Sequence, residues 1–364
     1  MNQNEKELVL RLCRFQNPNR RVLAELLEKG AMTSAVLGEL FWNRAAGVAC
    51  DVLEKEELMP HVPREARTAL LGARTQNREY NRSFFRCVGE LHDTLRSCGE
   101  HYAMLKGAYL CAKYPEGCRT SNDVDLLVPP EFLSEIGEAL LNSGYRQGAV
   151  KNGAFIPAKR EEIIRSRMLR GETVPYIKEV NLPYLRHFEV DINFSLDYKN
   201  GKSELVHELV ERAVTAKTGG MGIRTLARDD FFLHLCAHLY KEATTYPWIR
   251  MKRDMTLYKY IDLYMLLYEM TTSAADEIVA RAHALGLSTE CYFAVSEAVN
   301  LFGDESGAGA RILHGRSDVD ADGLFSVISP EEKKEYRYME RDTVRRFFCA
   351  DREKLLEEVG VWKP

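Results

Sequence analysis

The sequence of 364 residues predicts an α+β protein, with a small mixed β-sheet flanked by N-terminal and C-terminal helical regions. Three observations support this fold class. Apolar residues recur at helical spacing through the first hundred residues, short strand and helix patterns alternate over 99–200, and helical spacing returns after 201. We therefore expect a helical cap region at 1–98, a sheet core at 99–200 and a helical bundle at 201–364.

The N-terminal region is expected to consist of short helices followed by one long helix. Pro18, Gly30 and Pro60 separate the short helical patterns. A long charged helix is predicted from Arg64 to about Cys98. It should lead directly into the first strand of the core, at residues 101–105.

The core region shows alternating strand and helix signals. A strand is predicted at 123–128, and Pro129 and Pro130 then begin a helix that Gly144 ends. Two further strands, at 174–180 and 186–196, are expected to form a hairpin.

The C-terminal region is predicted to be helical, with helices at 254–270, 274–285 and 290–302. The segment Ser329-Pro330-Glu331-Glu332 has the pattern of a capping box with proline at the first helical position. It predicts a last, highly charged helix that continues to about Cys349.

Composition limits the function classes. The chain has no run of eighteen apolar residues and no signal-peptide pattern at its beginning, so we expect a cytoplasmic protein that does not enter a membrane. Its nine cysteines are scattered without metal-binding spacing, which favours reduced thiols. The net charge of −4 does not favour a protein that coats a long DNA.

Positive charge is nevertheless concentrated in one segment. Between Arg146 and Arg170 there are seven Lys or Arg residues and only two Glu. One interpretation is a solvated helix face. The other is a basic rim that guides a triphosphate or a phosphorylated acceptor, with room for a partner as large as a tRNA.

The most informative motif places a glycine turn before a strand with two carboxylates. Asp123 and Asp125 project from the same face of the predicted strand, whereas Val124 and Leu126 point into a core. Two neighbouring carboxylates repel each other unless a cation lies between them. Hard oxygen ligands of this kind suit Mg²⁺ or Mn²⁺.

The turn at Lys106-Gly107 supplies a complementary feature. Gly107 permits close backbone approach, and a helix over 108–113 would offer free amide groups to an anion. Lys106 adds a mobile cation at the same place. A phosphate site beside a divalent-metal site describes a site for a nucleoside triphosphate.

These motifs together carry a family resemblance. The Leu-Lys-Gly turn, a short helix and the segment from Arg119 through Ser121 to Val128 resemble the polymerase-β-type nucleotidyltransferase superfamily. Within it, the chain is most similar to the bacterial family of uncharacterised nucleotidyltransferases. The resemblance implies a third carboxylate on a later strand.

The third carboxylate is expected in the alternating segment at 187–194. Glu189, Asp191 and Asn193 share one face of this predicted strand. The resemblance assigns the third acid to Asp191, with Glu189 as the alternative. Relatives often have His where Asn193 stands, and most have Ser or Gly where Ala108 stands, so these two positions depart from the pattern.

The resemblance implies a metal-dependent transfer of a nucleoside monophosphate from an NTP to an acceptor, with release of pyrophosphate. Asp123, Asp125 and Asp191 would be the catalytic and metal-binding residues. The triphosphate would be held by the residues Lys106, Gly107, Ala108, Arg119 and Ser121. The acceptor can be a small molecule, a protein or an RNA, and the sequence does not select among ATP, CTP, GTP and UTP.

Two alternatives remain at this point. Ala108 and Asn193 favour a descendant that binds a nucleotide or a partner without transferring it, whereas the three acids favour an enzyme. His234 and His238 lie one helical turn apart, a spacing more often used for packing than for metal binding. The resemblance implies that His238 faces the nucleotide cleft as a substrate contact.

Overall fold

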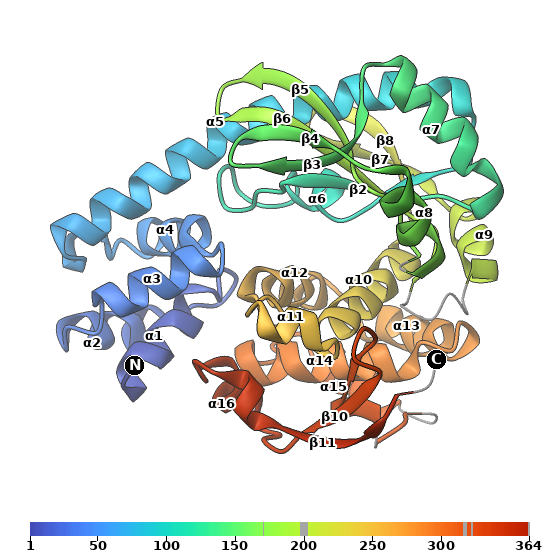
Figure 1. Ribbon diagram of the computed structural model, residues 1–364. Coiled ribbons are helices and arrows are strands. Elements are labelled where there is room, and N and C mark those ends of the chain that lie inside the picture. Colours follow the sequence, from blue (N-terminus) through green and yellow to red (C-terminus); the bar gives the residue numbers. More distant parts are fainter. Residues whose placement is uncertain (170, 197–202, 316–318, 322, 363–364) are drawn as a thin grey trace. The chain divides into compact units, whose positions relative to one another are not determined.

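The computed structural model describes residues 1–169, 171–196, 203–315, 319–321 and 323–362 (Figure 1). The chain forms two compact units. One comprises Ala73–Phe231, and the other comprises Met1–Gly72 together with Phe232–Pro364. The first is called the sheet unit below, and the second the helical unit. The mixture of helices and sheets confirms the predicted α+β class.

The sheet unit contains a mixed sheet of eight strands in the order β4-β3-β5-β6-β2-β1-β8-β7. Two neighbouring pairs, β2/β6 and β1/β8, are parallel, and the others are antiparallel. The strands are β1 (Ala103–Met104), β2 (Asp123–Leu127), β3 (Arg146–Lys151), β4 (Ala154–Pro157), β5 (Tyr176–Leu182), β6 (Leu185–Asn193), β7 (Val214–Thr218) and β8 (Met221–Thr225).

One face of this sheet is covered by helices. The long helix α5 (Arg64–Leu95) and helix α7 (Leu133–Asn142) bury their apolar residues against it (Figure 1). Val124 and Leu126 of β2 point into this core, as the alternation predicts. The carboxylates of β2 and β6 therefore lie on the opposite face. The sheet unit also contains α6 (Gly107–Leu110), α8 (Arg160–Leu169) and α9 (Ser203–Glu211).

The expected hairpin is confirmed by the antiparallel pairing of β5 with β6. A second hairpin, β7–β8, differs from the expectation that the chain is helical from 201 onward. Its turn is Gly219-Gly220, and both glycines have positive φ, as a two-residue hairpin turn requires. β8 pairs with β1, so this hairpin completes the sheet beyond the expected end of the core at 200.

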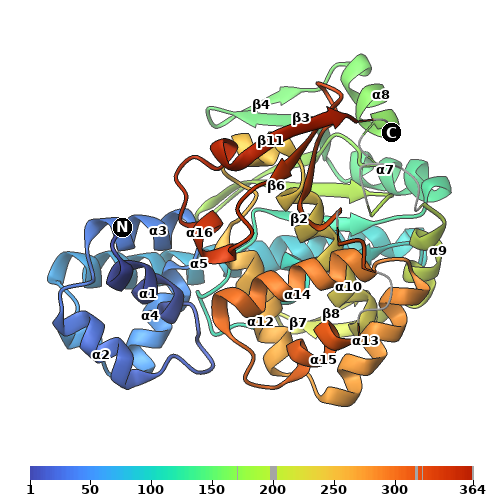
Figure 2. The same ribbon diagram turned by 90° about the horizontal axis from the view of Figure 1, so that it is seen from below.

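The helical unit contains two groups of helices, which Figure 2 shows most clearly. The later helices agree with the predicted positions at 254–270, 274–285 and 290–302. The first group is α1 (Gln3–Leu12), α2 (Arg20–Glu28), α3 (Ser34–Trp42) and α4 (Ala46–Lys55). The second is α10 (Arg228–Ala243) from Phe232 onward, α11 (Tyr246–Arg250), α12 (Leu257–Tyr268), α13 (Thr272–Ala284), α14 (Ser288–Phe302) and α15 (Ala308–His314).

The predicted last helix, from Ser329 to about Cys349, is wrong. The segment instead forms a three-stranded antiparallel sheet in the order β11-β10-β9. Ser329 ends a strand and pairs with Lys334 across a turn, so it does not cap a helix. The elements are β9 (Ser326–Ser329), β10 (Lys334–Tyr338), α16 (Thr343–Phe347) and β11 (Leu356–Val361).

Among the described helices, none has both the length and the hydropathy that a membrane span needs.

Candidate active site

Four carboxylates lie on one face of the two parallel strands β2 and β6. Asp123 pairs in register with Glu189, and Asp125 pairs with Asp191. Paired residues on neighbouring strands point to the same face and lie about 4.8 Å apart along the sheet. The structure thus brings together the three predicted acids and the alternative Glu189.

The four carboxylates of β2 and β6 repel one another when they are ionised. Burial, followed by the charges of Asp123 and Asp125, raises the pKa of Asp191 well above that of an ordinary aspartate. The same causes raise the pKa of Glu189. Glu172 adds a smaller repulsion at Asp191, because its backbone bridges to Asn193 at the end of β6. The carboxylates therefore resist being ionised together.

Lys106 supplies positive charge directly at this cluster. Its Nζ lies 2.9 Å from Oδ1 of Asp125, and both side chains are largely buried. Nδ2 of Asn193 donates to the same oxygen at 3.2 Å. Asn193, which departs from the family pattern, thus orients a predicted metal ligand. Lys106 has φ +42° and ψ −110°, a conformation that costs a non-glycine residue energy and is typical of functional sites.

The glycine of the turn is required by packing. A Cβ on Gly107 would lie 2.0 Å from Oγ of Ser121, so any side chain there would displace Ser121. Oγ of Ser121 donates to Oδ1 of Asp123 at 3.3 Å. The turn, the predicted phosphate contact Ser121 and the first acid are therefore in direct contact.

The helix after the turn is shorter than expected. Instead of continuing to 113, α6 is a single turn that ends at Leu110. The backbone N–H of Ala108 donates to the carbonyl of Leu105 at 3.3 Å. The turn therefore already uses the Ala108 amide, which the sequence assigned to the phosphates. The carbonyl of Ala108 accepts from Oγ1 of the buried Thr218 on β7, which anchors the turn to the sheet.

A row of polar residues on α5 holds the loop before β2. Nδ2 of Asn77 donates to the carbonyl of Gly117 at 2.9 Å, and Nδ2 of Asn81 donates to that of Arg119 at 2.9 Å. The hydroxyl of Tyr80 donates to the carbonyl of Ser121 at 2.7 Å. These residues share one face of the helix and position the approach to Asp123. The sequence reasoning missed them; the only signal was Asn and Tyr at helical spacing in a long charged helix.

Two of the predicted nucleotide contacts have internal partners. Arg119 is 5% exposed, and its guanidinium donates to the carbonyl of Thr120. His238 belongs to the helical unit, on α10, where Nε2 lies 3.3 Å from Oε1 of Glu242. Its ring is stacked on that of His234, with centroids 6.4 Å apart. Both residues stay predictions as nucleotide contacts.

One orphaned atom supports a cation at the cluster. Oδ1 of Asp191 is buried and accepts no hydrogen bond from any described residue. A buried carboxylate oxygen without a partner is costly, and a divalent cation would satisfy it. As the side chains lie, the described part of the chain contains no set of three or more His, Cys, Asp or Glu arranged around a common metal position. The donor types fit Mg²⁺ or Mn²⁺, and Lys106 now holds the Asp125 carboxylate.

Comparison with known families gives one finding. A sequence model of the family described as "Uncharacterised nucleotidyltransferase" matches residues 32–303, about three quarters of the chain. The chain belongs to the uncharacterised nucleotidyltransferase family. The matched region contains all eight strands of the sheet unit and every predicted site residue.

Family membership supports a general role in nucleotidyl transfer and confirms the resemblance inferred from the Lys-Gly turn and the acid pair. It also implies a nucleotide substrate. The small C-terminal sheet, β9 to β11, lies outside the region shared with this nucleotidyltransferase family. No curated protein matches the chain.

Proposed function

We propose that this nucleotidyltransferase moves a nucleoside monophosphate from an NTP to a nucleophilic oxygen of an acceptor and releases pyrophosphate. The observation that carries the proposal is the β2/β6 register, which places Asp123, Asp125, Glu189 and Asp191 together while leaving Oδ1 of Asp191 without a partner. A protein that only needed a stable sheet would gain nothing from four repelling carboxylates.

Asp123, Asp125 and Asp191 would hold Mg²⁺ or Mn²⁺ in this proposal. When bound, the divalent cation neutralises the triphosphate and lowers the pKa of an attacking oxygen. Asp191 would also accept the proton of the acceptor, because its Oδ1 atom has no hydrogen-bond partner among the described residues.

Lys106 would exchange its partner in the course of nucleotide binding. It is paired with Oδ1 of Asp125 in the structure, so this oxygen would become available when the Nζ group turns toward another anion. The phosphates of the NTP provide that anion. Ser121 and Arg119, which are buried beside the turn, would support the phosphate side of the site.

The test is nucleotide turnover by the full chain. Each α-labelled NTP is incubated with Mg²⁺ or Mn²⁺ and with pools of RNA, peptides and small hydroxyl compounds, and both pyrophosphate release and label transfer are measured. The proposal expects turnover with at least one NTP and its loss in Asp123→Ala/Asp125→Ala. Equal turnover by the double variant would contradict it.

A second candidate is a nucleotide-binding module without transfer. It is favoured by the Ala108 amide, which is already bonded within its turn, and by Lys106, which occupies Asp125. Metal-dependent NTP binding without pyrophosphate release across the three acceptor pools would support the module and exclude the enzyme.

A further inference from the structure

The sheet face that carries the acids ends, at the β3–β4 edge, in an exposed surface formed by Arg146, Val150 and Phe155, called the platform below. Residues paired across neighbouring strands share a face, and the register leads from Asp123 to Glu189, then to Ile177 and then to Arg146. Arg146 on β3 is therefore on the same face as the carboxylates. Val150 shares this face, and so does Phe155 on β4, with which Val150 pairs. Four strand spacings, about 19 Å, separate β2 from β4.

The platform is an arginine stacked on a phenylalanine. The guanidinium carbon of Arg146 lies 4.2 Å from the centroid of the Phe155 ring. Gly148 makes this arrangement possible, because a Cβ there would lie 2.8 Å from the ring of Phe155. Arg146 is exposed and Phe155 is half-buried. Val150, with 37% of its surface exposed, extends the apolar part of the platform.

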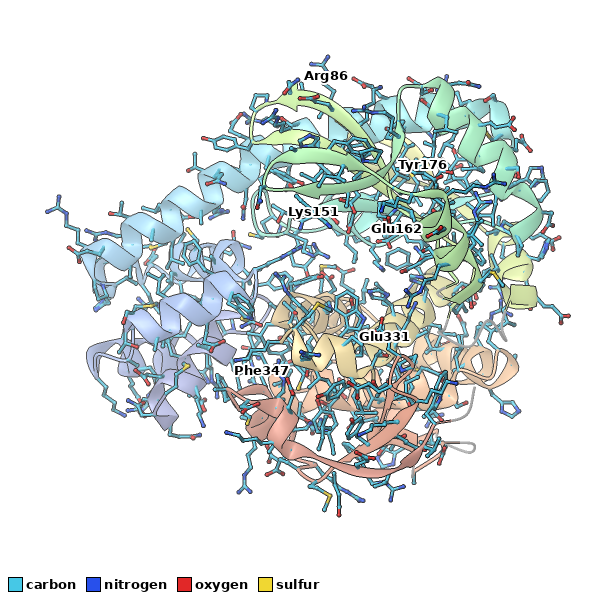
Figure 3. The ribbon with its side chains drawn as sticks, in the orientation of Figure 1. Arg86, Lys151, Glu162, Tyr176, Glu331 and Phe347 are labelled. Carbon is cyan, nitrogen blue, oxygen red and sulfur yellow. The ribbon has the colours of Figure 1, made fainter. Side chains whose placement is uncertain are left out.

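The surroundings of the platform are strongly positive. From Arg146 to Leu169 there are six exposed Lys or Arg residues and two Glu. Lys151 lies at the hairpin end of β3, and Glu162 is on α8 (Figure 3). Within the described ranges, no ion pair with a carboxylate forms at Lys151, Lys159, Arg160 or Arg165. This charge is therefore free to attract an anionic partner.

The segment is also joined to the acid cluster through the chain that follows α8. Oγ of Ser166 donates to the carbonyl of Glu172, and the N–H of Thr173 donates to the carbonyl of Ile192 on β6. The end of α8 is thus attached beside Asp191. The chain that follows α8 therefore connects this basic segment to the strand that carries Asp191.

We infer that the β3–β4 platform and α8 bind the single-stranded 3′ end of an RNA, whose terminal hydroxyl is the acceptor. This inference rests on the proposed nucleotidyl transfer. The 3′-oxygen attacks the α-phosphorus of the NTP, the bond to the β-phosphate oxygen breaks, and pyrophosphate leaves while the RNA grows by one nucleotide. Stacking on aromatic and arginine planes is the usual recognition of unpaired RNA bases, and lysines track the phosphates. The net charge of −4 disfavours a long duplex.

The test is binding of a 5′-fluorescent, unstructured RNA 12-mer to the full chain, measured by anisotropy at several salt concentrations. Arg146→Ala/Phe155→Ala is expected to weaken binding roughly tenfold or more, because a stacking platform is lost. Lys151→Glu/Lys159→Glu should weaken it and reduce its salt dependence. These exposed positions keep the test valid if the platform variant folds poorly.

The matched control is Val214→Ala/Lys217→Ala, which makes a similar change at β7, the opposite edge of the same sheet. It should bind within twofold of the wild type. Absence of RNA binding, equal binding of DNA of the same sequence, or a platform variant that binds like the control would each overturn the inference.

The two proposals fail separately. Asp123→Asn/Asp125→Asn should still bind the RNA without transfer. RNA binding by the wild type without any transfer contradicts the proposed function and the role of the RNA as acceptor, but not the RNA-binding platform. Pyrophosphate release that depends on NTP and on another acceptor, without RNA binding, contradicts only the RNA inference.

Discussion

Buried carboxylates occur in both compact units, and those at Asp254 and Glu297 of the helical unit differ from Asp191 of the sheet unit in how their charge is balanced. Asp254 receives two hydrogen bonds from Arg352, at 2.6 and 2.7 Å, and one from Tyr338 at 3.3 Å. Glu297 is paired with Arg346 and accepts from Thr343 at 2.9 Å. Burial raises the pKa of Glu297, and the charge of Arg346 and the hydrogen bonds from Arg346 and Thr343 offset part of this rise.

The sheet unit has four carboxylates on β2 and β6, where Lys106 forms an ion pair with Asp125. Burial and the neighbouring carboxylates raise the pKa of Asp191, and its Oδ1 atom has no hydrogen-bond partner among the described residues. This difference separates two uses of a buried acid. At Asp254 and Glu297 the charge is balanced by arginine, and these pairs fasten α16 and the C-terminal sheet. The orphaned oxygen of Asp191 instead fits the proposed cation, which comes from outside the chain.

The largest expected difference in activity between the two units comes from replacing one acid in each with its neutral amide. Asp125→Asn should lower transfer on the order of a thousandfold or more, because it removes a ligand used in the transition state. Asp254→Asn should act on transfer only through its loss of stability. Steady-state pyrophosphate release at a temperature where both variants are folded checks this. Comparable activity in the two variants would contradict the division into site and structure.

The arginine partners provide the next largest effect. Arg346→Met leaves Glu297 buried without its partner and should lower the free energy of unfolding by about 3–5 kcal/mol. Adding Glu297→Leu removes the orphaned charge and should recover most of that loss. Urea unfolding followed by tryptophan fluorescence measures both. If the double variant is no more stable than the single one, the pair is not what holds this charge.

The pH dependence of stability tests whether the carboxylates of β2 and β6 repel one another in the folded protein. The pKa of Asp191 is higher in the folded than in the unfolded protein, so the folded state holds more protons. Stability of the metal-free protein should therefore fall as pH rises from about 4 through the raised pKa. Asp191→Asn cannot ionise, so it should be more stable than the wild type at neutral pH and should show a flatter pH profile.

Thermal unfolding with a chelator between pH 4 and 8 makes this measurement. Adding Mg²⁺ should stabilise the wild type above the raised pKa and should affect Asp191→Asn less. If the stability of the wild type rises steadily with pH, the carboxylates of β2 and β6 do not destabilise the folded protein when they ionise.

The smallest effect concerns the turn at Gly107. Gly107→Ala introduces a Cβ 2.0 Å from Oγ of Ser121 and should cost about 1–3 kcal/mol of stability. Adding Ser121→Gly should restore much of it. The matched control is Gly38→Ala on α3, where nothing lies within 4 Å of the added Cβ, and it should be neutral or slightly stabilising. Equal effects of the two single substitutions would show that Ser121 does not require the glycine.

Much of the central region could be predicted because its signals are local. Alternation in 123–128 and 187–194 placed the acids on one face, and the structure confirms the β5–β6 hairpin. The parallel pairing of β2 with β6 brings the acids together. The strand at 101–105 was also expected, although only Ala103–Met104 pairs regularly. Periodicity determines which side chains share a face, and a glycine turn marks where a strand ends.

The remaining features depend on pairing over long distances in sequence. One of the two partners of β1 is β8, more than a hundred residues later, and the pattern of 214–225 alone does not reveal it. The ladder from Asn77 and Asn81 to the loop before β2 spans about forty residues. At Ser329, local capping chemistry favoured a helix, but pairing with Lys334 in β10 prevailed. Tertiary contacts override local propensity at such places.

The most direct test of the central claim is isothermal titration of each NTP into the full chain with Mg²⁺ and with a chelator. The claim is that the acids of β2 and β6 bind a divalent cation together with a nucleotide. It predicts metal-dependent binding of at least one NTP, lost in Asp123→Asn/Asp125→Asn and kept in Glu161→Gln/Glu162→Gln, which removes equal charge from exposed α8 positions. Binding that is unchanged by the chelator or by the loss of both aspartates would contradict it.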